Sequence, residues 1–322
     1  MRRTVALLVA APLALVAACG GSDDEPAVTG GGGGGELEQV SVGVIPIVDV
    51  SPIYLGRQQG FFEECGLDLT LETAQGGAAI VPAVVSGQWQ FGFSNITSLL
   101  LAASEGLPLR VVANGTASTG EQGADFGAVV APPDSGITGA ADLAGRTVAV
   151  NTLNNIGTTT VRESVRAAGG DPDGVQFVEL PFPEMPAALE QGNVDAAWVV
   201  EPFLAVSTDA GAQIVTSNFV DTADDLTVAA YFTSEQYAQQ NPEAVECFSD
   251  AMAQSLEYAQ QNPDAVREVL GEYTQIDPAI AEAMTLPAWP AEINRDSVQT
   301  LSDLAVEDGL LDEAPDLDAL LP

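Results

Sequence analysis

Short apolar runs alternate with longer amphipathic stretches from about residue 40 onwards. Runs of a few apolar and β-branched residues are typical of strands, whereas apolar positions repeating every 3.6 residues are typical of helices. The pattern predicts strands at 40–45, 67–72, 90–93, 109–113 and 126–131, and helices at 52–63, 78–85 and 96–105. Such alternation favours a mainly parallel sheet covered by helices.

A second alternation of the same kind begins after Pro132-Pro133, which ends the first one. It predicts a helical turn at 141–143, strands at 147–150, 175–179, 196–200, 213–216 and 226–232, and helices at 158–168, 185–191 and 202–210. Only helices are predicted after that, at 235–241, 242–261, 263–273, 278–284 and 297–308, several of them opened by Pro, Asp or Asn. We therefore expect two α/β lobes and a helical tail, with the strands at 126–131 and 226–232 crossing between the lobes.

The first 18 residues are typical of a secretory signal. Arg2 and Arg3 precede an apolar run, which ends in Val16-Ala17-Ala18-Cys19. The run is shorter than the roughly 20 apolar residues that span a bilayer. A cysteine just after small residues resembles a bacterial lipobox, in which that cysteine is lipidated and becomes the mature N-terminus. The alternative is an ordinary cleaved signal followed by a chance cysteine.

The segment 19–38 is predicted to be a flexible tether, because it is polar and acidic and contains six consecutive glycines. Together with lipidation at Cys19, it predicts an extracytoplasmic protein anchored by lipid to the cell membrane. The folded part is then expected to divide into a first lobe (39–128), a second lobe (129–228) and a return to the first lobe (229–322).

The chain has no histidine, and its nine basic residues are all arginine. The commonest general base and metal ligand is therefore missing, and so is the lysine that a pyridoxal Schiff base needs. We expect no cofactor and no metal, although catalysis by carboxylates alone stays open.

The formal net charge is −37, and removal of residues 1–18 takes away two arginines and no acids, which gives −39. Nucleic acid is excluded as a partner on this ground, because phosphate binding needs a basic face. Only 17% of residues are charged, so the charge is one-sided rather than dense.

Four junctions between a predicted strand and the following helix carry polar residues or glycine. They are Pro46–Ser51, Gln75-Gly76-Gly77, Ser94-Asn95 and Asn154–Thr159. In open α/β sheets ligands bind outside the carboxyl ends of strands, where helix N-termini present free N–H groups. Glycine lets a ligand approach the backbone, while Asn, Ser and Thr supply directional hydrogen bonds. The same residue types cap helices, which is the alternative explanation for each junction taken singly.

Several segments together make the chain similar to the solute-binding proteins of ABC importers, in the group that binds nitrate, sulfonates, taurine and thiamine-pyrimidine precursors. The resemblance covers roughly 40–264. The segments that carry it are Pro52–Leu55, Gly60–Leu67, Gly76-Gly77, Ser86–Gly92, Asp142–Val150, Gly192–Ala197 and Glu201-Pro202.

The resemblance implies a periplasmic-binding-protein fold of type II, with two lobes around a cleft and the C-terminal helices packed on the first lobe. It implies ligand capture by hinge closure without catalysis, and delivery to an ABC permease in the membrane. A fungal enzyme that makes the pyrimidine precursor shares this fold but works through Lys and His, both absent here. We expect a monomer. Outside the cytoplasm, Cys65 and Cys247 form a disulfide or stay two separate thiols. The family layout allows the disulfide.

The nature of the ligand is less constrained. Helix N-termini accept anionic groups, whereas Asp49 and Glu201 in a cleft would accept N–H groups or a cation. Their alternatives are a solvated loop acid and an acid at a helix N-terminus, respectively. Trp198, Phe182 and Phe203 are candidates to cover an aromatic ring, or are plain core. The residues expected in the ligand site are Asp49, Gly76, Gly77, Ser94, Asn95, Asn155, Gly157, Thr158, Thr159, Trp198 and Glu201.

These residues favour a small nitrogen-bearing organic solute, heteroaromatic or zwitterionic, such as a compound like a vitamin precursor, with a sulfonate of the taurine type next. Two other functions stay open. One is a ligand-sensing protein that presents its closed form to a membrane receptor, and the other is an extracellular hydrolase that uses carboxylates only.

Overall fold

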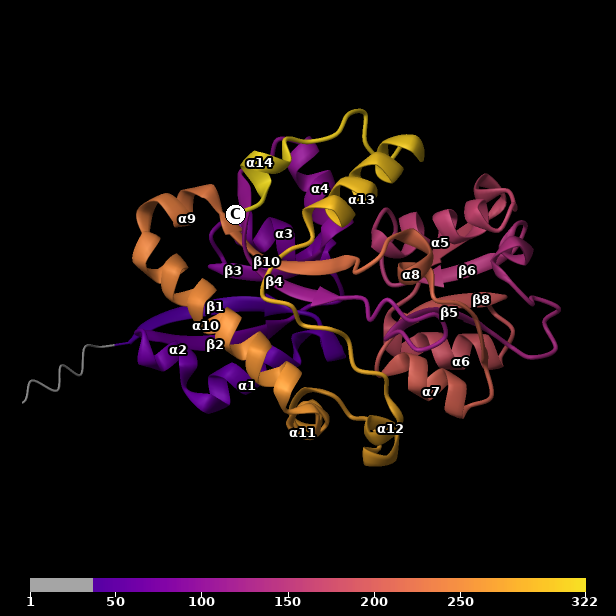
Figure 1. Ribbon diagram of the computed structural model, residues 1–322, viewed down its shortest axis with the longest axis horizontal. Helices are drawn as coiled ribbons and strands as arrows, with labels where there is room; N and C mark the ends of the chain where they lie inside the picture. The colour runs from indigo at the N-terminus through magenta and orange to yellow at the C-terminus, as the bar shows by residue number, and fades with distance from the viewer. Residues whose placement is uncertain (1–36) are drawn as a thin grey trace, which may run out of the picture. The chain divides into compact units, whose positions relative to one another are not determined.

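A computed structural model describes residues 37–322, which form two five-stranded sheets covered by helices (Figure 1). The signal segment 1–18, the lipidation site Cys19 and nearly all of the tether 19–38 lie outside the described residues. The tether prediction was wrong at its end, because Glu38 already belongs to strand β1. In residues 37–322 no helix is long and apolar enough to cross a bilayer, and no three His, Cys, Asp or Glu side chains cluster as metal ligands.

The first sheet has the strand order β2-β1-β3-β10-β4. Its strands are β1 (Glu38–Val44), β2 (Leu67–Thr73), β3 (Phe91–Asn95), β4 (Leu109–Ala117) and β10 (Thr227–Ser234). Strand β1 pairs in parallel with β2 and β3, whereas β10 runs antiparallel to β3 and β4. The last strand to join this sheet is therefore the one that returns from the second sheet.

The second sheet has the order β7-β6-β8-β5-β9. Its strands are β5 (Gly127–Ala131), β6 (Thr147–Val150), β7 (Gln176–Glu179), β8 (Ala196–Val200) and β9 (Gln213–Thr216). Strand β6 pairs in parallel with β7 and β8, and β5 runs antiparallel to β8 and β9. We call the parts built on the two sheets the first and the second lobe. Each is mainly parallel with one reversed strand, which confirms the predicted fold class.

The helices follow the predicted order with a few differences. They are α1 (Ser51–Gln59), α2 (Phe61–Glu64), α3 (Gly77–Val85), α4 (Ile96–Ser104), α5 (Ile156–Ala167), α6 (Met185–Glu190), α7 (Phe203–Asp209), α8 (Asn218–Thr222), α9 (Glu235–Gln240), α10 (Pro242–Gln261), α11 (Pro263–Tyr273), α12 (Pro278–Ala283), α13 (Arg295–Glu307) and α14 (Leu317–Leu320). Short 3-10 turns lie at Val48–Val50, Ala140–Leu143, Pro172–Gly174 and Phe182–Glu184.

The single helix expected at 52–63 is wrong, because Gly60 adopts φ 82° and separates α1 from α2. A left-handed residue ends a helix, and glycine adopts that conformation without a steric penalty. Helix α5 starts at Ile156, two residues earlier than predicted, because Asn155 caps it. The short helices α8 and α14 were not predicted.

Helices cover both faces of the first sheet. On β3, the ring of Phe91 stacks on Phe248 of α10, and the next residue, Gly92, faces Ile80 and Val84 of α3. Because successive residues of a strand point to opposite faces, α10 and α3 lie on opposite sides of the sheet. The C-terminal helices thus belong to the first lobe, and a disulfide between Cys65 and Cys247, with Cα atoms 5.6 Å apart, fastens α10 to the segment after α2. The lobe limits at 128 and 228 stay a prediction.

Candidate functional site

The loops at the carboxyl ends of strands from both sheets meet at one junction between the lobes. The backbone N–H of Val48, after β1, donates to the carbonyl of Glu201, after β8, at 3.0 Å. The N–H of Ile156, at the start of α5, donates to Oδ1 of Asn95 at 3.3 Å. Side-chain Nδ2 of Asn151 donates to the carbonyl of Gln75 at 3.3 Å. The four polar junctions of the sequence therefore lie together, two helix starts facing one another across the lobes.

Asn95 contacts both lobes through one oxygen. Its Oδ1 accepts the N–H of Ser98 at 2.9 Å, which caps α4, as well as the N–H of Ile156. Its Nδ2 donates to Oγ of Ser98 at 3.0 Å. Capping of α4 accounts for the bonds between Asn95 and Ser98, but it does not account for the bond to Ile156 of the second lobe.

The predicted residues on the second lobe mainly cap α5. Oδ1 of Asn155 accepts the N–H groups of Gly157 at 3.0 Å and Thr158 at 3.3 Å, and its Nδ2 donates to Oδ1 of Asn151 at 2.6 Å. The hydroxyl of Thr158 donates to the carbonyl of Asn155 and accepts its N–H, which completes a capping box. Thr159 donates to the same carbonyl at 3.3 Å. These polar atoms are satisfied within the helix start.

Three predicted glycines allow close approach at the junction, and none of them adopts a left-handed backbone conformation. A Cβ on Gly76 would lie 2.8 Å from Cγ2 of Thr152 in the other lobe. A Cβ on Gly77 would lie 2.0 Å from Oγ of Ser94. On Gly157 it would lie 2.3 Å from Cε3 of Trp198, so the indole rests against the start of α5. Space, rather than backbone conformation, therefore requires glycine at these positions.

The aromatic residues of the second lobe pack on one another. Trp198 is 3% exposed, and its ring lies 5.5 Å from Phe182 and 6.0 Å from Phe219. Phe203 stacks on Phe182 at 6.0 Å. The core-packing explanation therefore holds for these rings, although the indole Nε1 of Trp198 is buried without a hydrogen-bond partner.

Asp49 is buried, 2% exposed, in the 3-10 turn after β1, so the solvated-loop explanation is wrong. Its carbonyl accepts the hydroxyl of Thr116 and the indole N–H of Trp289, each at 3.4 Å. Burial raises the pKa of the carboxyl to about 7, and the like charge of Asp125 adds to the rise. Hydrogen bonds from its own backbone and from Thr116 oppose it. Oδ1 of Asp49 has no partner among the described residues.

Glu201 is equally buried and bridges the lobes. Its Oε2 accepts the N–H of Ala205 at 2.9 Å, at the start of α7. Its Oε1 accepts the N–H of Thr285 at 3.1 Å, in the segment that follows α12. Burial raises the pKa of the Glu201 carboxyl to about 7, against the effect of these two N–H groups. Glu201 is therefore an acid at a helix N-terminus, as one of the two sequence interpretations has it, and it also contacts the segment after α12.

Several residues of the junction were not predicted from the sequence. Asp125, also 2% exposed, stands just before β5 and accepts hydrogen bonds from Ser118, Thr119 and Phe126. Burial raises the pKa of its carboxyl. Trp289 and Tyr273 reach the loop 47–51 from the helical tail. An acid directly ahead of a predicted strand was the only local signal for Asp125, and nothing local marks the two aromatic residues.

Four buried polar atoms at the junction have no hydrogen-bond partner among the described residues. They are Oδ1 of Asp49, Oγ of Ser94, Oγ1 of Thr152 and Nε1 of Trp198. Buried polar groups are nearly always paired, so such a group of unpaired atoms needs an explanation. Two hydroxyls, one carboxylate oxygen and one N–H, contributed by both lobes, are therefore without a partner in the protein.

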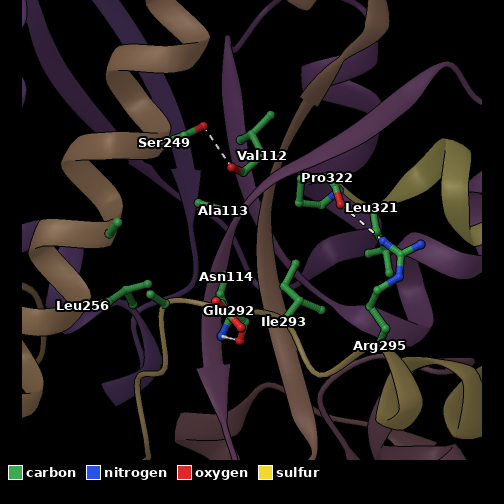
Figure 2. A pocket seen from close by; sticks show the side chains of 12 residues that line it. Val112, Ala113, Asn114, Ser249, Leu256, Glu292, Ile293, Arg295, Leu321 and Pro322 are labelled. Atoms are coloured by element: carbon green, nitrogen blue, oxygen red, sulfur yellow. Dashed lines mark hydrogen bonds between the residues drawn. The ribbon is translucent and has the colours of Figure 1, made fainter.

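Two cavities lie beside the junction. One, of about 540 Å³, lies between α7 and α12 and is lined by Glu201, Asp125 and Thr285 among others. The other, of about 440 Å³, lies between α5 and the end of α13 and is lined by Thr158, Thr159 and Arg162. A third cavity, of about 340 Å³, lies at strand β4 and α10, and Figure 2 shows Asn114, Ser249 and Arg295 along it. None of the predicted site residues lines this third cavity.

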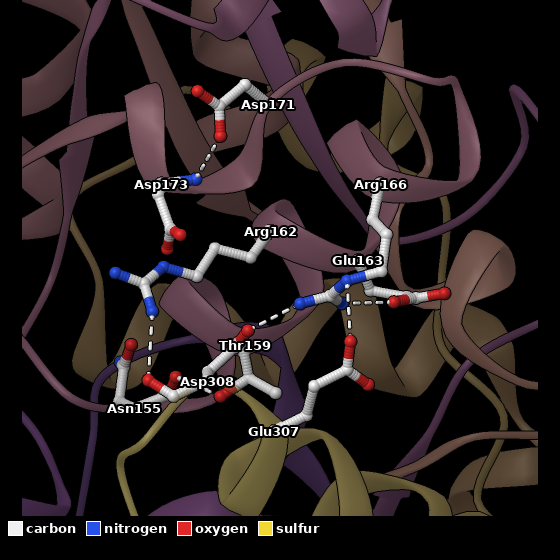
Figure 3. A network of polar contacts seen from close by, with 9 residues as sticks. All are labelled: Asn155, Thr159, Arg162, Glu163, Arg166, Asp171, Asp173, Glu307 and Asp308. Carbon is white, nitrogen blue, oxygen red and sulfur yellow. Dashed lines mark hydrogen bonds and ion pairs between the residues drawn. The ribbon is translucent and has the colours of Figure 1, made fainter.

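An ionic network joins the lobes beside the second cavity (Figure 3). Arg166 of α5 pairs with Glu163 of its own helix and with Glu307 and Asp308 at the end of α13. Arg162 donates to the carbonyl of Asp308 at 3.4 Å. The lobes are therefore in contact through hydrogen bonds at the junction and through ion pairs at α5, which is a closed arrangement.

Comparison with known proteins places the chain in a family. The model of the NMT1/THI5-like family matches residues 47–266. The taurine-binding periplasmic protein of Escherichia coli is 26% identical over 66% of this chain, but the match spans 65% of that relative, less than two thirds of its length.

Two solved structures share the fold. The periplasmic nitrate-binding protein from Synechocystis superposes with a TM-score of 0.76 at 14% identity, covering 89% of this chain and 86% of that one. A Candida albicans protein described as having the generic periplasmic-binding-protein fold gives 0.70 at 16% identity, covering 89% and 96%. The family match extends over more than half of the sequence, and the fold agrees with it. This chain belongs to the NMT1/THI5-like family and has the periplasmic-binding-protein fold.

Proposed function

We propose that the protein is the solute-binding component of an ABC importer, anchored outside the cell membrane by lipid at Cys19. It captures a small organic solute between its lobes and delivers it to a permease. The observation that carries the proposal is the junction itself, where loops at the carboxyl ends of strands from both sheets are in contact and carry four unpaired buried polar atoms. The relatives support it, because they are named for binding small solutes in the periplasm.

The expected ligand is nitrogen-bearing, heteroaromatic or zwitterionic, with a sulfonate of the taurine type as the second choice. Asn95 from one lobe and Ile156 from the other already touch, so a ligand at this place contacts both lobes. A ligand that bridges both lobes binds the closed state better than the open one, and only this difference drives closure.

Native mass spectrometry on protein isolated from its producing cells tests the proposal, since tight binders carry their ligand through purification. A bound mass below about 1,000 Da supports capture of a small solute; pockets for such molecules measure roughly 300–1,000 Å³. The identified compound is then incubated with the protein, and unchanged compound separates binding from hydrolysis.

Mutation of Asn95 to Ala should weaken the affinity for that compound, measured by calorimetry. Asn294→Ala is the matched control, because Asn294 caps α13 through the N–H of Ser297 in the same way but belongs to a different helix start. Equal affinity in wild type, Asn95→Ala and Asn294→Ala would contradict a site at the junction.

A further inference from the structure

Three buried carboxyl groups lie at the lobe junction without a cationic partner. Asp49, Asp125 and Glu201 are each 2% exposed, and none takes part in an ion pair among the described residues. Apart from Arg2 and Arg3, the chain has seven basic residues, all arginine. Six of them bond to groups elsewhere, and Arg110 is exposed. Buried carboxylates are normally paired or fully hydrogen-bonded, so each of the three needs an account of its partners.

Two of the three carboxyl groups are satisfied by the protein. Oδ1 of Asp125 accepts the N–H groups of Thr119 and Phe126, both at 2.9 Å, and its Oδ2 accepts the hydroxyl of Ser118 at 2.7 Å. The two oxygens of Glu201 each accept a backbone N–H. Asp49 alone has an oxygen, Oδ1, with no partner. Asp49 is therefore the carboxyl that is free to accept a donor from outside the protein.

The loop that carries Asp49 is held by residues from distant parts of the chain. The hydroxyl of Tyr273 donates to the carbonyl of Ile47 at 3.2 Å and lies 2.8 Å from Oγ of Ser51. Trp289 donates to the carbonyl of Asp49. The loop is thus fixed on both sides of Asp49 by contacts that leave Oδ1 free. Such preorganisation is typical of a binding group, because it removes the cost of ordering the loop when a ligand arrives.

The cavity next to the junction is also lined by acidic residues without a basic one. The 540 Å³ space between α7 and α12 is lined by four acidic residues, Asp125, Glu201, Asp209 and Asp277, and by no basic one. Its remaining walls are mostly apolar, from Leu204, Ile280 and alanines. Clefts lined by charge of one sign raise the local concentration of the opposite charge. A positively charged organic molecule would be attracted to this space, and a small anion would be repelled.

We propose that the solute carries a protonated nitrogen, and that Oδ1 of Asp49 accepts a hydrogen bond from it. The ligand class is then an organic amine or amidine, or a zwitterion with its cationic end at Asp49, and a simple anion such as nitrate is excluded. A charge-assisted hydrogen bond between N⁺–H and a carboxylate supplies the partner that Asp49 lacks. An anion at the same place would face the carboxyl of Asp49, to whose charge that of Asp125 adds, and no ion pair of the described residues supplies a cation there. The inference rests on the proposed function, since it assumes that a solute binds at the junction.

Calorimetry with chemically matched probes tests the ligand class without a mutation. Taurine is compared with 2-hydroxyethanesulfonate, and benzylamine with benzyl alcohol, because each pair differs only in an amine replaced by a hydroxyl. Benzoate is the anion with the same ring. Sodium nitrate and sodium bicarbonate are the simple anions, and the compound found by native mass spectrometry joins the panel. We expect binding only from compounds that carry a protonated nitrogen. Tightest binding by an anion or by a neutral compound without a nitrogen donor would overturn the proposal.

The variant Asp49→Asn tests the residue, because it keeps the shape of the side chain and removes the charge. We expect it to weaken the affinity for the tightest-binding amine by about tenfold to a hundredfold, as loss of a buried charge partner does. Asp134→Asn, the same change at an exposed site, should leave affinity unchanged. Thermal melts of the empty variants check folding. Wild-type affinity in Asp49→Asn overturns the assignment of Asp49.

The outcomes separate this inference from the proposed function. Tight binding of an anion with closure of the lobes would retain the importer function and overturn the cationic ligand. Absence of a bound mass from cells, together with no binding of any probe, would overturn both.

Discussion

The two loops that meet at the lobe junction occupy equivalent places after β1 and β6, yet their polar groups are used differently. In the second lobe, Asn155 and Thr158 at the start of α5 satisfy one another within a few residues, although the hydroxyl of Thr152 just before them stays unpaired. In the first lobe, the loop around Asp49 is held by Thr116, Trp289 and Tyr273, and keeps an oxygen unpaired. Hydrogen bonds completed locally, as at Asn155 and Thr158, position the start of a helix, whereas a loop held by distant residues, as at Asp49, is rigid and still leaves a polar atom for a ligand.

The largest expected effect concerns the distant bracing of the first-lobe loop. The disulfide between Cys65 and Cys247 spans 182 residues and fastens α10, whose neighbour α11 carries Tyr273. The variant Cys65→Ser with Cys247→Ser should lose about 4–5 kcal/mol of unfolding free energy, on the chain-entropy account of cross-links. Urea unfolding of oxidised protein and of the double variant measures the loss.

Free-thiol labelling of denatured, unreduced protein is the control for that comparison. Two labelled thiols in the folded part would show that the bond does not form, and equal stability of the two proteins would contradict the bracing role. The second-lobe loop, which has no such brace, should keep its hydrogen-exchange protection better than the first-lobe loop when the bond is absent.

The next effect is a dependence of stability on pH, which comes from the buried carboxyl groups of the junction and not from the neutral Asn and Thr side chains that complete the start of α5. The pKa values of Asp49 and Glu201 are raised by burial to about 7 in the folded protein, from 3.8 and 4.5. Between those values the folded state binds more protons than the unfolded state, so the empty protein loses stability as pH rises from about 4 to 7 and levels off above.

The size of that loss is at most about 3–4 kcal/mol for each carboxyl. The like charge of Asp125 adds to the rise of the Asp49 pKa, while the hydroxyls of Tyr231 and Tyr273 stay neutral over this range because burial raises their pKa values well above 10.0. Thermal melts from pH 4 to 8 measure the slope, and Asp49→Asn and Glu201→Gln should each reduce it. A slope that is the same in wild type and both variants would contradict the assignment.

A smaller effect is expected from the locally completed loop. Asn155→Ala removes the cap of α5, three hydrogen bonds from one side chain, and should lower unfolding free energy by about 1–2 kcal/mol. Asn155→Asp is the conservative control, because aspartate caps helices as well as asparagine does. Urea unfolding compares the three proteins, and an unchanged midpoint in Asn155→Ala would show that the cap is dispensable.

The contrast between the loops also explains what the sequence could predict. The periodicity of apolar residues and the Asn, Gly and Thr at strand ends are local signals. The two α/β lobes, the succession of strands and helices along the chain and the polar loops at strand ends were therefore predictable, whereas the order of the strands within each sheet was not predicted. The partners of Asp49 were not, because Thr116 is 67 residues away and Trp289 is 240. Contacts of that separation exist only once the sheet and the C-terminal helices are assembled. For the same reason Glu201 could be identified as a helix-terminal acid, but its bond to Thr285 could not.

Trp289→Phe tests the distant contact to Asp49 directly, because it keeps a ring and removes the indole N–H. The carbonyl of Asp49 retains the hydroxyl of Thr116, so we expect a loss of about 1 kcal/mol in unfolding free energy, typical of one hydrogen bond. Affinity for the tightest amine should fall more than for Trp89→Phe, a control indole on the opposite face of the first sheet near Gly43 and Ile80. Equal affinity in both variants would show that Trp289 does not position Asp49.

The smallest effect is expected from the ion pairs that join α5 to α13 (Figure 3). The side chain of Arg166 is 27% exposed and that of Glu307 is 59% exposed, so solvent screens the attraction, although Asp308 is only 6% exposed. Arg166→Gln should lower unfolding free energy by about 0.3–1 kcal/mol, and the difference should shrink as salt rises from 0.05 to 1 M.

Because these pairs join the lobes, the variant should also raise the radius of gyration of the empty protein in small-angle scattering at low salt. Arg146→Gln is the matched control, since Arg146 pairs with Asp195 within the second lobe and cannot affect closure. If both variants scatter like the wild type, the closed arrangement depends on the hydrogen bonds of the junction, through Glu201 and Asn95, and the ion pairs only follow it.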